Sequence, residues 1–174
     1  INVSKPLVIL GTARSEGETR RAIDISFPKG TVDLIDLNHW RVAPYDYGYH
    51  HSDDDFLSVI DATLSARAII FATPVYWYSM SGQLKIFFDR LTDLLDVAKE
   101  KGWALAGKSV GVLASGFEDD LPEGFEVPFR RTSDYFGMHY CGPCISARVA
   151  VGDLGKVSKK TSFDLASECS RSEC

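Results

Sequence analysis

The sequence lacks the features that mark membrane, secreted and disulfide-stapled proteins. It has no run of 18 uninterrupted apolar residues, because the longest candidate, residues 66–80, is broken by Arg67 and Pro74. Its 4 cysteines in 174 residues are too few for a disulfide framework. No charged segment followed by an apolar core opens the sequence, so we expect a cytoplasmic protein without a membrane partner.

Positive charge is also scarce. The chain carries 19 Lys and Arg against 24 Asp and Glu, a formal charge of −5, so we do not expect nucleic acid as a partner. Hydrophobic residues make up 45% and charged residues 25%, the balance of a folded globular protein. Without repeats, linkers or low-complexity tracts, we expect a single domain over residues 1–174, with a polar tail from about residue 167.

Apolar runs alternate with helical patterns along the chain. The runs are residues 7–10, 32–37, 66–72, 109–114 and 145–151, and the helical patterns are residues 18–27, 53–65, 81–96 and 122–137, with a weaker one from 153. Five such β-α units predict a parallel sheet with helices on both faces. The runs at 32–37 and 145–151 carry interspersed polar residues, so we place them at the sheet edges. This gives an α/β fold, a doubly wound, five-stranded parallel sheet of order 2-1-3-4-5, which is the flavodoxin-like arrangement.

In such a sheet the ligand lies beyond the carboxyl ends of the central strands. Function is therefore expected in the loops at residues 11–19, 73–81 and 115–121. The first loop combines hydroxyl groups, a helix start and the guanidinium of Arg14, which together suit a phosphate. It is neither a Walker loop nor a Gly-x-Gly-x-x-Gly loop. The alternative is a polar turn in which Ser15 or Thr19 caps the helix.

The second loop carries three consecutive aromatic residues, Tyr76, Trp77 and Tyr78. Surface turns seldom contain such a run, and a flat conjugated ligand would use it together with the loop amides. The alternative is that these rings fill a core or a subunit interface.

Together the two loops resemble those of the flavodoxin-like NAD(P)H-dependent FMN reductases and related quinone reductases, over roughly residues 5–152. In that family a Gly-Ser/Thr-x-Arg-x-x-x-x-Thr/Asn loop holds the FMN phosphate. A Thr-Pro-x-Tyr loop followed by Ser-x-x-x-Gln-Leu-Lys-x-Phe-x-Asp-Arg borders the flavin ring. The matching residues here are Gly11, Thr12, Arg14 and Thr19, then Thr73, Pro74, Tyr76, Ser79, Gln83, Leu84, Lys85, Phe87, Asp89 and Arg90.

The resemblance implies an FMN-dependent enzyme that passes hydride from NADPH or NADH to a quinone or similar small acceptor. The cofactor carries the chemistry, so no catalytic side chain is expected. A homodimer or homotetramer is implied as well. Alternatives are a flavodoxin-type electron carrier without a dedicated substrate, and a scaffold that has lost its cofactor. The expected cofactor-binding residues are Thr12, Arg14, Ser15, Thr19, Pro74, Val75, Tyr76, Trp77, Tyr78, Ser115 and Gly116.

Two further patterns are interpreted as structural. Cys141 and Cys144 have the spacing of a thioredoxin motif, but the run behind them predicts a strand and not an activating helix. We interpret them as structural cysteines in the turn that enters this strand, since a bridge would need a tight turn between them. His50 and His51 precede three aspartates, a pattern that could form a metal site. A helix start capped by Ser52 explains it better, so we expect no metal.

Overall fold

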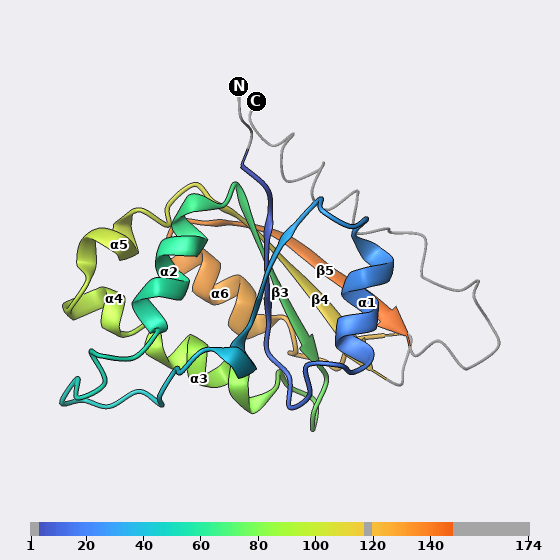
Figure 1. Ribbon diagram of the computed structural model, residues 1–174, viewed down its shortest axis with the longest axis horizontal. Coiled ribbons are helices and arrows are strands. Elements are labelled where there is room, and N and C mark those ends of the chain that lie inside the picture. Colours follow the sequence, from blue (N-terminus) through green and yellow to red (C-terminus); the bar gives the residue numbers. More distant parts are fainter. Residues whose placement is uncertain (1–3, 117–119, 148–174) are drawn as a thin grey trace.

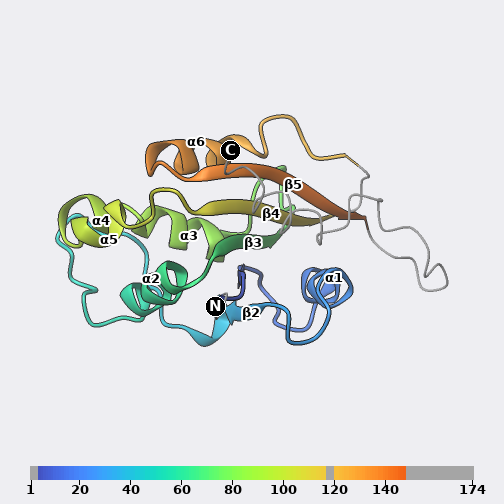
Figure 2. The same ribbon diagram turned by 90° about the horizontal axis from the view of Figure 1, so that it is seen from above.

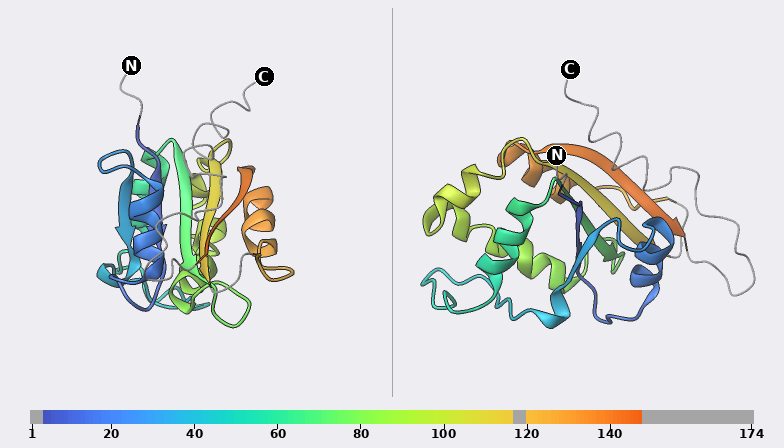
Figure 3. Two further views of the ribbon diagram at one scale, coloured as in Figure 1. Left: turned by 90° about the vertical axis from the view of Figure 1, so that its right-hand side faces the viewer. Right: turned by 45° about the horizontal axis from the view of Figure 1, so that its top comes forward.

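The computed structural model describes residues 4–116 and 120–147, which form a parallel sheet flanked by helices (Figure 1). The sheet has five strands in the order β2-β1-β3-β4-β5, with β3 at its centre, which confirms the predicted topology (Figure 3). The strands are β1 (Leu7–Leu10), β2 (Asp33–Asp36), β3 (Ala68–Pro74), β4 (Ser109–Gly116) and β5 (His139–Ala147).

Helices connect successive strands. They are α1 (Glu18–Ser26), η1 (Leu37–His39, a 3-10 turn), α2 (Phe56–Ser65), α3 (Gly82–Arg90), α4 (Asp93–Asp96), α5 (Lys99–Trp103) and α6 (Val127–Tyr135). Figure 2 shows α1 on one side of the sheet, opposite α2 to α5. Among the described residues, no helix is long and apolar enough to cross a membrane.

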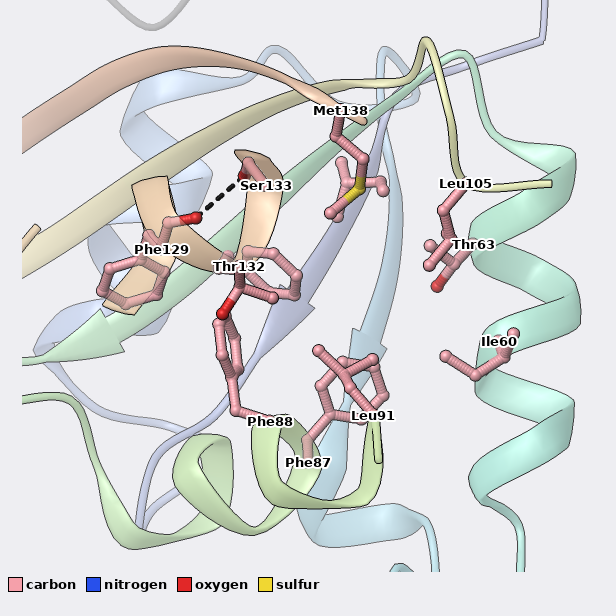
Figure 4. Close-up of a pocket in the computed structure, with 12 residues that line it drawn as sticks. Ile60, Thr63, Phe87, Phe88, Leu91, Leu105, Phe129, Thr132, Ser133 and Met138 are labelled. Carbon is pink, nitrogen blue, oxygen red and sulfur yellow. Dashed lines mark hydrogen bonds between the residues drawn. The ribbon is translucent and has the colours of Figure 1, made fainter. Parts of the chain in front are cut away.

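Each face of the sheet has its own core. On the α1 face, Ala22 and Ile23 pack against side chains of β1, β3 and β4. On the other face, α2, α3 and α6 contribute a cluster of phenylalanines in which the Phe56 and Phe87 ring centroids are 5.6 Å apart. A small cavity of about 10 Å³ remains among these side chains (Figure 4). It has room for about one water molecule and none for a cofactor.

The structure changes several predicted element boundaries. The helix expected over 81–96 is divided into α3 and α4, and the helices expected from 53 and 122 begin at Phe56 and Val127. Ser52 therefore does not cap α2, because Asp55 occupies the N-cap position, without a side-chain cap bond. The strand expected over 145–151 begins at His139, and the part of that range beyond residue 147 lies outside the described residues.

The cysteine motif lies inside β5 and not in a turn before it. The pairing of β4 with β5 shifts register between Val110 and Val112, and Gly142 takes a positive φ of 97° there. Such a bulge accommodates an extra residue and bends the strand. Cys141 is disulfide-bonded.

Candidate functional site

The loops after β1 and β3 meet the end of β4 at the carboxyl edge of the sheet. In Figure 1 the loop after β1 and the loop after β3 lie side by side at the lower end of the strands. The Ser81 hydroxyl donates to the Gly11 carbonyl at 2.7 Å, which joins these two loops. A Cβ atom on Gly11 would lie only 2.6 Å from the Leu84 Cβ atom, so only glycine permits this close approach of β1 to α3.

The first loop presents a series of backbone amides without acceptors. The Gly11 amide donates to Ala72, and the next amide with an acceptor belongs to Arg21, which donates to Gly17. Within the described residues, the amides of residues 12–20 thus have no hydrogen-bond acceptor. The N-cap of α1 is Gly17, which has no side chain to cap the helix. Free amides at an open helix N-terminus are the donors that bind an anion.

The side chains predicted for this loop take different roles. Arg14 is exposed and has no ion-pair partner within the described chain, whereas Arg20 and Arg21 pair with acids of α1. The hydroxyls of Thr19 and Ser115, both buried, lie 2.7 Å apart and so connect the first loop to the end of β4. Neither Ser15 nor Thr19 caps α1, which removes the alternative that this loop is only a capped turn.

The loop after β3 is a tight hairpin. Tyr76 and Ser79 exchange two backbone hydrogen bonds of 2.9 and 3.1 Å, which leaves Trp77 and Tyr78 as the two residues of the turn. Both have positive φ, 49° and 66°. Two positive φ values define the turn type that favours Asn-Gly, so bulky aromatic residues are strained there.

These aromatic side chains are not part of the core. Trp77 is 92% exposed and Tyr78 is 72% exposed, and both stand at the edge of the predicted site. Strained backbone that carries exposed aromatic residues is characteristic of a ligand-contacting segment. The core-filling alternative is therefore wrong for these two rings.

The hairpin is held to the sheet by its two ends. Pro74 is buried at the end of β3, and the Val75 amide donates to the Ser115 carbonyl at 2.8 Å. The Thr73 hydroxyl accepts from the Ser81 amide at 2.9 Å, and Ser81 caps α3 by accepting from the Leu84 amide. Gly116 ends β4 next to Val75, whereas the following residues 117–119 lie outside the described structure.

Sequence reasoning missed the bonds of Ser81 and Asn38. Asn38, in η1, donates from its side-chain amide to the Thr12 carbonyl at 2.8 Å. No local pattern could reveal this contact because 26 residues separate the partners and only the β1–β2 pairing brings them together. Ser81 is at least detectable as a helix-capping residue before an apolar-periodic segment.

Arg90, at the end of α3, is buried with two carboxylates. Its guanidinium pairs with Asp54 and Asp93, donates to the Ala43 carbonyl at 3.1 Å and lies 4.8 Å from the centre of the Phe56 ring. Burial opposes the ionisation of Asp54, but hydrogen bonds from Arg90 and from two backbone amides outweigh it and hold its pKa below the ordinary value. Arg90 thus fixes the connection between β2 and α2 against α3.

Asp54 is therefore part of a buried salt bridge. Within the described part of the chain, no three His, Cys, Asp or Glu side chains gather in a way that could hold a metal ion. The neighbouring His50 ring instead contacts Asp46 at 2.5 Å.

The fold and the three loops define a flavodoxin-like protein whose ligand site lies at the carboxyl edge of a parallel sheet. The chain belongs to the NADPH-dependent FMN reductase family, whose family model matches residues 4–123. It is 28% identical over 160 residues to a Bacillus subtilis (strain 168) protein named "Putative NAD(P)H-dependent FMN-containing oxidoreductase YwqN", covering 86% of this chain and 88% of that one.

Two solved structures are similar. The Trp repressor binding protein from Bacillus subtilis superposes with a TM-score of 0.67 at 26% identity, covering 96% of both chains. General stress protein 14 from Treponema denticola, solved in complex with FMN, gives a TM-score of 0.64 at 17% identity, covering 95% of this chain and 98% of that one. The family membership confirms the predicted class: the protein is an oxidoreductase that depends on FMN and NAD(P)H.

Proposed function

We propose that the first loop binds the phosphate of FMN and that the hairpin and the end of β4 border its flavin ring. The observation that carries this proposal is the series of amides at residues 12–20 without acceptors. Thr12, Arg14, Ser15 and Thr19 belong to the phosphate side, whereas Ser115 and Gly116 join the ring side with the hairpin residues Pro74, Val75, Tyr76, Trp77 and Tyr78.

The residues present fit this cofactor. A phosphate requires donors and positive charge. The first loop supplies the start of α1, together with amides and an Arg14 guanidinium that have no partner among residues 4–116 and 120–147. A flavin ring requires flat apolar contacts, which the exposed rings of Trp77 and Tyr78 supply. When bound, FMN supplies hydride transfer between NAD(P)H and an acceptor.

The protein's own side chains bind and orient in this scheme. The Ser81–Gly11 and Thr19–Ser115 hydrogen bonds keep the phosphate side and the ring side of the site in register. Trp77 and Tyr78, at the tip of the hairpin, can stack on a planar acceptor as well as on the cofactor. This supports a quinone or a similar small aromatic molecule as the electron acceptor.

We also propose that the protein forms a homodimer or homotetramer. A groove of about 310 Å³ between α3, α4 and α6 supports this, since it combines Phe88, Leu95, Tyr135 and Phe136 on the surface. Light scattering after size-exclusion chromatography tests the oligomer, and a monomer at all concentrations would contradict it. The cytoplasmic location stays a prediction.

The placement of the phosphate is tested with Arg14→Ala. Cofactor-free protein is titrated with FMN and with riboflavin, which lacks the phosphate. Arg14→Ala should weaken FMN binding about tenfold, the low end for a charge-assisted hydrogen bond because Arg14 is exposed, and leave riboflavin binding unchanged.

Arg21→Ala is the matched control, because it removes the same charge from a residue that pairs with Glu18 on the outside of α1. It should leave both affinities unchanged. Equal FMN affinities of the wild type and Arg14→Ala would remove Arg14 from the site. Equal affinities of the wild type for FMN and riboflavin would reject the phosphate site itself.

A further inference from the structure

The side chain of Asn38 bonds to the first loop from the β2 side of the sheet. Its side-chain amide donates to the Thr12 carbonyl at 2.8 Å and lies 3.4 Å from the Ser15 hydroxyl. Both partners belong to the segment proposed to bind the phosphate. Asn38 itself lies in η1, directly after β2.

Asp36 holds Asn38 in position. One carboxylate oxygen of Asp36 accepts from the backbone amide of Asn38 at 3.0 Å and so caps η1. The backbone amide of Trp40 closes the turn by donating to the Leu37 carbonyl. Asp36 is only 7% exposed and pairs in register with Leu10, the last residue before the first loop. The other oxygen of this buried carboxylate has no hydrogen-bond partner within the described residues and lies 4.0 Å from the His39 ring nitrogen Nδ1. The position of Asn38 is thus set by the end of β2.

The bond to Thr12 fixes the orientation of a peptide unit. In a planar trans peptide the carbonyl and the following amide point in opposite directions, and the described chain contains no cis peptide. With the Thr12 carbonyl directed at Asn38, the Ala13 amide points away from Asn38. That amide belongs to the series that has no acceptor in the structure. The contact that occupies the carbonyl therefore orients a donor of the anion site.

We propose that Asn38 is a positioning residue that orients the first loop for the phosphate and so makes the site prefer FMN over riboflavin. This inference rests on the proposed placement of the phosphate. Asn38 acts through the peptide of Thr12 and needs no contact with the cofactor. Its loss allows the Thr12–Ala13 peptide to rotate, so an ordered donor becomes a disordered one before binding.

The test compares the FMN and riboflavin affinities of cofactor-free Asn38→Ala with those of the wild type. FMN should bind about three- to tenfold more weakly, the effect of one ordinary hydrogen bond, whereas riboflavin binding should be unchanged. Asn38→Asp should lose at least as much, because its carboxylate cannot donate to the Thr12 carbonyl. Asp33→Ala is the control: it changes an exposed residue at the opposite end of β2 and should leave both affinities unchanged.

The Ala13 amide gives a second readout. Its NMR resonance should move in cofactor-free Asn38→Ala but not in Asp33→Ala, because the peptide is released in the first variant only. An equal loss of FMN and riboflavin affinity in Asn38→Ala would overturn the proposal, since it would show a general structural role.

The inference fails separately from the proposed function. If Arg14→Ala lowers the preference for FMN over riboflavin but Asn38→Ala leaves it unchanged, the phosphate site stands and Asn38 has no part in it. If neither variant changes that preference, both the phosphate placement and the role of Asn38 are wrong.

Discussion

At the scale of single residues, we expect the aromatic residues at the hairpin tip to lower the stability of the fold while they serve its function. Trp77 and Tyr78 occupy left-handed conformations that cost a side-chain-bearing residue about 1 kcal/mol. No compensating burial exists, since both rings are largely exposed. Such strain is retained where the side chains serve a ligand. Replacement by glycine should therefore stabilise the fold and impair the enzyme.

We predict that Tyr78→Gly is more stable than the wild type by about 0.5 kcal/mol, because glycine adopts positive φ without strain but is more flexible when unfolded. Turnover with an aromatic acceptor should fall about 2- to 12-fold, as expected for one lost aromatic contact. Urea unfolding and steady-state kinetics measure the two effects.

Tyr47→Gly is the control for this prediction. Tyr47 is 89% exposed and is not among the residues with positive φ, so glycine should bring no gain in stability there. If Tyr78→Gly is less stable than the wild type, the strain at the tip is smaller than the backbone geometry indicates. If acceptor turnover is unchanged, Tyr78 does not contact the acceptor.

At the scale of elements, α3 connects the site to the rest of the fold. Its first turn is capped by Ser81, which also bonds to Gly11, and its last residue is the buried Arg90. Asp54 lies just before α2. One of its carboxylate oxygens pairs with Arg90, and the other accepts from the backbone amide of Phe56. One ion pair thus fixes two helices and the connection between them.

Asp54→Asn should destabilise the protein by about 3 kcal/mol, because it leaves the buried charge of Arg90 with only one carboxylate. Asp89→Asn, which removes a carboxylate from the exposed pair with Lys85, should cost less than about 0.5 kcal/mol. Urea midpoints measure both. Equal midpoints for the two variants would show that the pair with Asp54 contributes no more than a surface pair.

The same pair predicts a pH dependence. The pKa of Asp54 is lower in the folded protein than its ordinary value of 3.8, so its contribution is fully present above that pH and is lost as the pH falls through the folded value. The difference in stability between the wild type and Asp54→Asn should therefore be constant near neutral pH and shrink below about pH 3.8. A difference that stays constant down to acid unfolding would contradict this assignment.

Element order could be predicted from the sequence more fully than element ends. Apolar runs identify buried strands, and the interspersed polar residues correctly marked β2 and β5 as edges. The expected single helix over 81–96 is wrong because bonds between residues three apart, such as Thr92 to Asp89, tighten the chain after Arg90 while the apolar side chains keep facing the core. Local patterns do not contain the long-range contact of Arg90 with Asp54 that accompanies this break.

For the proposed site, the sequence indicated the candidate loops but not the contacts between them. Arg14 and the aromatic run are recognisable by residue type alone. The Thr19–Ser115 and Asn38–Thr12 bonds join residues 96 and 26 positions apart, so they exist only once the strands are paired. The left-handed turn at Trp77 and Tyr78 is hidden as well, since its sequence lacks the Asn or Gly typical of that turn.

At the scale of the whole molecule, the proposed site spans the centre of the sheet. The loops after β1 and β3 and the end of β4 belong to adjacent central strands, and side-chain or backbone bonds join each of the three to another. A cofactor that bridges these loops binds only when all three strands are paired. Its binding energy should therefore stabilise the entire fold and not one segment of it.

Thermal unfolding of the cofactor-free protein with added FMN tests this directly. At an FMN concentration 100-fold above the Kd, the fold should gain about 2.7 kcal/mol, which corresponds to roughly 5–10 °C in Tm for a chain of this size. At the same FMN concentration, Arg14→Ala with its tenfold weaker binding should gain only about 1.4 kcal/mol, whereas Arg21→Ala should match the wild type. The transition should remain a single step in all three proteins, because the loops belong to one sheet. A second transition that ignores FMN would show that the strands carrying the site unfold separately from the rest.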